Sequence, residues 1–238
     1  MRRIAYVFVF CLAAMCAQGG VVKSIMGGMH ARHASAGNVG PYDSRVEYLA
    51  SSGGGEYIDT GIYHYKTNDI HIKVWTYGAY PTRHSERFFG ATNGLYATMF
   101  QRYAQSKNFF YTGILLYGQI ACRDLPTNVT YEVTVHSEDT GRSPGTEYAT
   151  INGIQYSNGY GWNMPQVSAS TVILFPNVAR NNRIYYFRID NQISLVPVRI
   201  GRIGYMYDEM TGILYGNCAG KGAFIVGPDV PEPQEETP

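Results

Sequence analysis

The residues from Arg183 to Asn217, RIYYFRIDNQISLVPVRIGRIGYMYDEMTGILYGN, have the pattern of short strands joined by tight turns. Tyr185, Phe187 and Ile189 recur at every second position, which is the period of a half-buried strand. The residues from Asp208 to Gly212 predict a hairpin turn, because glycine readily adopts the left-handed backbone that such turns need. The stretch therefore predicts antiparallel strands with Tyr185, Phe187 and Ile189 in the core.

Short segments with the strand pattern also occur in the residues before Arg183. Apolar residues alternate over 69–77 and 131–136, and 171–175 is nearly all apolar, as in a central strand buried on both faces. Asn152-Gly153 lies between two strand-like segments and is a strong hairpin signal. No stretch has a long helical period. We therefore expect an all-β fold, an antiparallel two-sheet sandwich over residues 45–227, with the 56–62 strand near the C-terminal strands.

Composition narrows the class of protein. The 238 residues are only 16% charged but 14% aromatic, and they include 21 Tyr and 27 Gly. This balance is typical of extracellular β-proteins rather than helical cytosolic enzymes. A net charge of +1 gives no electrostatic attraction for nucleic acid or an anionic membrane.

The N-terminal residues have the pattern of a secretory signal peptide. Two arginines precede an apolar run, Ile4 to Cys16, that is too short to span a bilayer, with small residues at its end. We therefore expect a signal peptide over residues 1–18, with cleavage near Ala17. A lipoprotein signal at Cys16 is disfavoured by the bulky Met15. Residues 19–44 are expected to form a flexible linker and 228–238 a disordered tail. No later segment suits a transmembrane anchor, which predicts secretion or display at the cell surface.

Two segments carry a family resemblance. VEYLASSGGGEYIDTGI, at 46–62, resembles the opening of laminin-G-like, concanavalin A-like jelly-roll domains of secreted and surface proteins from bacteria and phages. The close of the chain, with Pro197-Val198-Arg199 and Gly204 to Asp208, resembles the end of the same domains. The resemblance implies a jelly-roll sandwich and an extracellular location. It does not imply a ligand, because one fold carries many functions.

The acidic and histidine residues predict no catalytic or metal site. Glycosidases of this fold place acids two apart on one strand, whereas Glu56 and Asp59 are three apart and diverge. Asp59 and Asp208 are interpreted as turn residues that accept backbone hydrogen bonds. Four histidines lack cysteine partners at metal spacing and are expected to be ordinary surface or strand residues: His64, His71, His84 and His136. Calcium is compatible with the resemblance, but no loop of closely spaced Asp and Asn supports it. We therefore expect no cofactor and no enzyme activity.

Cys122 and Cys218 would remain after signal cleavage. In an oxidising compartment each is the other's only intramolecular partner, so a disulfide is a hypothesis that the sequence leaves open.

The candidate ligand-binding residues are in a loop after the Asn-Gly hairpin. Tyr and Trp rings stack on sugar rings, and Asn side chains both donate to and accept from hydroxyls. These residues are Tyr156, Asn158, Tyr160, Trp162 and Asn163. The alternative is that the aromatic rings only fold the loop onto the sheet. The sequence thus predicts a binding module for an extracellular glycan, or alternatively a structural or adhesive domain that contacts surface proteins.

Overall fold

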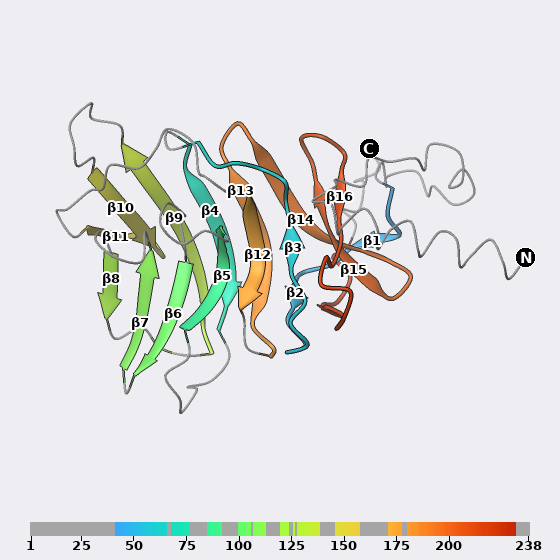
Figure 1. The fold of residues 1–238 in the computed structure, drawn as a ribbon, viewed down its shortest axis with the longest axis horizontal. Helices are drawn as coiled ribbons and strands as arrows, with labels where there is room; N and C mark the ends of the chain where they lie inside the picture. Colours follow the sequence, from blue (N-terminus) through green and yellow to red (C-terminus); the bar gives the residue numbers. More distant parts are fainter. Residues whose placement is uncertain are drawn as a thin grey trace, which may run out of the picture.

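Alternating apolar residues form strands throughout the part of the chain that the structure describes. The computed structural model describes residues 41–65, 68–76, 85–91, 100–105, 107–112, 120–123, 126, 128–138, 146–157, 171–177 and 180–231. These residues form 17 strands and no helix (Figure 1). The strands are β1 (Ser44–Arg45), β2 (Leu49–Ala50), β3 (Ile58–Asp59), β4 (Ile70–Trp75), β5 (Ser85–Ala91), β6 (Phe100–Gln105), β7 (Lys107–Thr112), β8 (Ile120–Arg123), β9 (Thr130–Glu138), β10 (Thr146–Ile151), β11 (Ile154–Ser157), β12 (Val172–Asn177), β13 (Arg183–Ile189), β14 (Ile193–Ile200), β15 (Ile203–Asp208), β16 (Leu214–Tyr215) and β17 (Ile225–Val226).

The strands form two antiparallel sheets. The large sheet has eleven strands, eight of them in the order β11-β10-β9-β4-β13-β14-β15-β16, with β1, β2 and β17 added at the side. The small sheet has the order β3-β12-β5-β6-β7-β8. Phe89 on β5 contacts Phe187 on β13, with ring centroids 5.4 Å apart, so the two inner faces pack on each other. The fold is the predicted all-β, antiparallel two-sheet sandwich.

Several sequence predictions are confirmed locally. In β4, Ile70, Ile72 and Val74 are buried and the residues between them are partly exposed. Residues 172–175 are all buried, and their strand β12 lies between β3 and β5. At the tip of the β10–β11 hairpin, Asn152 and Gly153 have φ values of 48° and 80°, the left-handed pair of a type I′ turn.

One core prediction is wrong because of a β-bulge. Phe187 and Ile189 are fully buried, but Tyr185 is only partly buried, and Ile184 takes its place in the core. The pairing of β13 with β4 shifts between Ile184 and Tyr186, which leaves Tyr185 as the extra residue. Strict alternation back from Phe187 places Tyr185 in the core, but the extra residue at the bulge shifts the alternation, so Tyr185 lies outside the core.

The ordered domain extends beyond the predicted bounds of 45 and 227. Tyr42 packs edge-on against Tyr207, with ring centroids 5.0 Å apart. Val46 pairs with Asp229, and the amide of Val230 donates to the carbonyl of Arg45 at 2.9 Å. The two ends of the domain therefore meet, as predicted, but the first residues of the expected tail are held in place. The residues predicted to form the signal peptide and most of those predicted to form the linker lie outside the described residues.

The sheet order does not permit the hypothetical disulfide. Cys122 is on β8, at one edge of the small sheet (Figure 1). The amide of Cys218 donates a hydrogen bond to the carbonyl of Tyr57, which is next to β3 at the other edge. Five strand spacings, about 24 Å, separate the edges, and a disulfide needs Cα atoms within about 7 Å. The pairing of Cys122 with Cys218 is therefore incompatible with this fold.

Among the described residues, no helix is long and apolar enough to cross a membrane.

Candidate functional site

The predicted ligand loop is described only at its first residue. Tyr156 is on β11, where its backbone pairs with Ala149, and its ring is partly buried against the core. This position favours the packing interpretation for Tyr156. Asn158, Tyr160, Trp162 and Asn163 lie outside the described residues.

The outer face of the large sheet presents a different candidate site. Because β4 alternates strictly, its core residues point inward, and His71, Lys73 and Trp75 point away from the core. On the neighbouring β9, Tyr131 and Val133 are buried, so the residues between and beside them face outward together with those of β4. The bulge at Tyr185 sets the phase of β13, and Tyr186 and Arg188 join the same face.

Strand register aligns polar side chains into a row across this face. Thr134 on β9 pairs with His71 on β4, His71 pairs with Arg188 on β13, and Arg188 pairs with Ser194 on β14. The row continues to Glu209, whose amide donates to the Ser194 carbonyl at 2.8 Å. Residues that are far apart in the sequence thus form one polar line across four strands.

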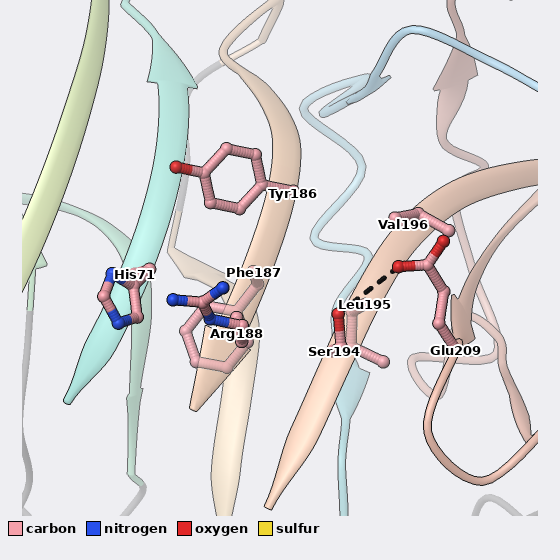
Figure 2. Close-up of a pocket in the computed structure, with 8 residues that line it drawn as sticks. All are labelled: His71, Tyr186, Phe187, Arg188, Ser194, Leu195, Val196 and Glu209. Carbon is pink, nitrogen blue, oxygen red and sulfur yellow. Dashed lines mark hydrogen bonds between the residues drawn. The ribbon is translucent and has the colours of Figure 1, made fainter. Parts of the chain in front are cut away.

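A hollow of about 270 Å³ lies over this row. Figure 2 shows His71, Arg188 and Tyr186 on one side of it and Ser194 with Glu209 on the other. The Ser194 hydroxyl donates to Glu209 Oε2 at 3.4 Å. The described residues that line the hollow are His71, Tyr186, Phe187, Arg188, Ser194, Leu195, Val196 and Glu209. The partly exposed ring of Tyr186, one guanidinium and several oxygen and nitrogen atoms therefore surround an open depression on the sheet.

Charged neighbours surround the aromatic ring of this hollow. Burial and the carboxylate of Glu132 raise the pKa of Tyr186, while Lys73 and Arg188 act in the opposite direction. Lys73 Nζ lies 3.0 Å from Glu132 Oε1. The Tyr186 hydroxyl therefore stays protonated at neutral pH and can donate a hydrogen bond.

A second hollow, also about 270 Å³, lies farther along the same sheet. The guanidinium of Arg183 is stacked between Tyr48 and Trp75, at 4.3 and 4.4 Å from the ring centroids. Tyr48, Ala50, Trp75, Asn181, Arg183 and Ile225 line it. Both hollows combine aromatic walls with an arginine.

The carboxylates considered as catalytic candidates have structural roles. Glu56 is 1% exposed and accepts hydrogen bonds from the hydroxyls of Ser51 and Ser52 and the amides of Ser52 and Gly54. Desolvation alone would raise the pKa of Glu56, but these hydrogen bonds together lower it, so it is ionised at neutral pH. Asp59 accepts from the amide of Gly61 at 2.9 Å.

Asp208 confirms its predicted role in a turn. Its Oδ1 accepts from the amides of Ser194 and Met210 at 2.9 and 3.1 Å, and its Oδ2 accepts from the hydroxyl of Thr211. Gly212 has a φ of 75°, as the hairpin prediction requires.

Sequence reasoning missed a cluster of acids and histidines that includes His71 of the polar row and lies where β4 begins and β13 ends. Asp69, His71 and Asp190 each place one possible metal-ligand atom within 4.8 Å of the others. The nitrogen Nδ1 of His136 lies 2.5 Å from Asp69 Oδ1. The available signal was the spacing of Asp69 and His71, two apart beside a strand, which places both side chains on one face. The partners Asp190 and His136 follow only from the register.

No family model matches the chain, and no curated protein matches its sequence. A native heptameric SAP-like pentraxin from Limulus polyphemus aligns with 63% of this chain and 72% of its own, at 10% identity and a TM-score of 0.39. Scytalido-glutamic peptidase with a peptide-based transition-state analog aligns with 74% of this chain and 89% of its own, at 10% identity and a TM-score of 0.27. Similarity at this level assigns neither family nor function.

Proposed function

We propose that this chain is a non-catalytic, secreted or surface-displayed module that binds carbohydrate in the hollow over the polar row. The observation that carries the proposal is the combination of the Tyr186 ring with hydrogen-bonding side chains in one open depression. Sugars are bound by stacking on an aromatic ring and by hydrogen bonds from groups that can donate and accept. Arg188 supplies donors, Glu209 supplies acceptors, and the Ser194 hydroxyl can do both.

The character of the hollow supports binding rather than hydrolysis. Among the described residues that line it, Glu209 is the one carboxylate. The carboxylate is also engaged, because its Oε1 lies 3.1 Å from Arg45 and its Oε2 accepts from Ser194. Most glycosidases need two carboxyl groups on either side of the scissile bond. A site with one engaged carboxylate is suited to orienting a ligand.

A glycan array with the full chain, followed by calorimetry on the best ligand, tests this proposal. Tyr186→Ala and Glu209→Gln are expected to weaken binding about tenfold or more, because each removes one group that contacts the sugar. Tyr63→Ala and Glu47→Gln are matched controls, since both side chains are exposed and neither lines the hollow. Equal losses in the variants and controls, or unchanged binding in Tyr186→Ala, would show that the site is elsewhere.

The alternative, an adhesive domain that contacts proteins, has less support on the described surface. Ile203 and Met210 are 61% and 54% exposed, but Ile203 begins β15 and Met210 follows its other end, so the two do not form one apolar patch. Specific protein interfaces need contiguous area of about 800 Å² per partner. A negative array together with self-association in solution would favour this alternative.

A further inference from the structure

The main chain fixes two of the three residues in the acid and histidine cluster. Asp69 immediately precedes β4, and Asp190 immediately follows β13. The two strands pair Ile70 with Ile189, and the amide of Asp190 donates to the carbonyl of Asp69 at 3.0 Å. The two carboxylates are therefore held beside each other by sheet hydrogen bonds rather than by mobile loops. His71 enters the same space from β4.

The imidazole of His71 leaves one nitrogen without a hydrogen bond. Its Nδ1 lies 3.2 Å from the hydroxyl of Thr134, which can accept the Nδ1 proton. In that tautomer Nε2 carries a lone pair, and Asp190 Oδ1 lies 3.2 Å from it without hydrogen-bond geometry. Nε2 is buried from solvent and forms no hydrogen bond in the described structure. A buried polar atom without a partner is costly, and a cation between the nitrogen and the carboxylates would supply the partner.

Further side chains orient the candidate ligands from behind. His136 Nδ1 lies 2.5 Å from Asp69 Oδ1, and Arg188 Nε lies 3.1 Å from Asp190 Oδ1. Metal ligands are commonly held by such outer hydrogen bonds, which fix the tautomer of a histidine and the direction of a carboxylate. The side chain of Arg188 is 49% exposed. It therefore has room to move into solvent when a metal cation binds to Asp190.

We propose that Asp69, His71 and Asp190 form a binding site for Zn²⁺. One imidazole and two carboxylates are a ligand set that zinc accepts, whereas Ca²⁺ and Mg²⁺ prefer oxygen ligands alone. Three protein ligands leave a fourth coordination position for water. Zinc at this site would link the ends of β4 and β13, and this role does not depend on whether the neighbouring hollow binds carbohydrate.

Equilibrium dialysis of the full chain with Zn²⁺, after removal of metal by a chelator, tests the proposal by elemental analysis. We expect one tightly held zinc ion per chain. Asp190→Asn and His71→Ala should each weaken it at least tenfold, because each removes a direct ligand. Glu132→Gln removes a carboxylate from the same face, at 59% exposure and outside the cluster, and is the matched control. Thr134→Val keeps the ligands but removes the hydroxyl behind His71, and should weaken binding by about 10- to 100-fold.

Thermal unfolding gives a second measurement. Zinc at about 100 times its Kd should raise the Tm of the native chain by roughly 5–10 °C, and that of Asp190→Asn by much less. Asp69→Asn preserves side-chain shape and replaces His71→Ala if the latter does not fold. Absence of a retained zinc ion would overturn the proposal. It would also be overturned by equal binding in the native and Asp190→Asn chains, which would place the metal on other histidines, or by equal stabilisation with Ca²⁺.

Discussion

Replacement of Phe187 by Ala should produce a large loss of stability. The side chain is 0% exposed and lies at the interface of the two sheets, where its ring centroid is 5.4 Å from that of Phe89. Removing a fully buried phenylalanine costs its transfer free energy and leaves a cavity, which together amount to about 3–5 kcal/mol. The lost contact with Phe89 is part of this cost, and a double-mutant cycle with Phe89→Ala should give a coupling of about 0.5–1.5 kcal/mol.

The neighbouring Tyr185 provides a sharp control. Strict alternation places Tyr185 and Phe187 on the same face and predicts similar losses. The bulge places Tyr185 outside the core, against Tyr48 at 5.6 Å between ring centroids, so Tyr185→Ala should cost only about 0.5–1.5 kcal/mol. Urea unfolding measures both losses. A loss below about 1 kcal/mol for Phe187→Ala, or equal losses for both variants, would refute the assignment of the inner face.

Three further outcomes follow from the structure. Glu56→Gln should cost about 1.5–3 kcal/mol in urea unfolding, because hydrogen bonds to a buried carboxylate weaken when its charge is lost. Since the folded state lowers the pKa of Glu56 from 4.5, its contribution is fully present above about pH 4.5 and is lost as the pH falls through the folded pKa, so the native chain should lose more stability on acidification than Glu56→Gln. Gly153→Ala should destabilise the fold by about 1–2 kcal/mol, because the φ of 80° is unfavourable for alanine. No atom lies within 4 Å of the added methyl group, so no steric clash adds to this cost. An unchanged Tm would contradict the type I′ turn. A reducing agent should leave the Tm of the mature protein unchanged, whereas a clear decrease would mean that Cys122 and Cys218 approach each other despite the sheet order.

Local patterns in the sequence predicted most of the strands and turns. The alternation in β4, the apolar run of β12 and the Asn152-Gly153 turn depend on neighbouring residues only, and the structure confirms each of them. The position of Tyr185 was not predictable in the same way. A bulge is a property of a strand pair, and its partner β4 is more than a hundred residues earlier in the chain.

The candidate site depends even more on pairing between distant segments. The polar row exists only because three strand registers make its members direct cross-strand neighbours. These members are Thr134, His71, Arg188 and Ser194. None of the four is unusual in its local sequence. The predicted loop, by contrast, was identified from local composition, and its one described residue, Tyr156, packs against the core. The register of a sheet decides which outward residues become neighbours, and one sequence does not reveal it.

The meeting of the two domain ends has a mechanical consequence. The entering segment pairs antiparallel with the leaving segment, through Val230 to Arg45, Glu47 to Pro228 and Gly227 to Tyr48, each at 2.9 Å between nitrogen and oxygen. A force that pulls the two ends apart therefore acts on the outermost hydrogen bond first and then on the next, as in opening a zipper. Shearing would load all of them at once. The domain should accordingly begin to peel open under a small tension at this corner, while the pairing of β4, β13, β14 and β15 behind it remains intact.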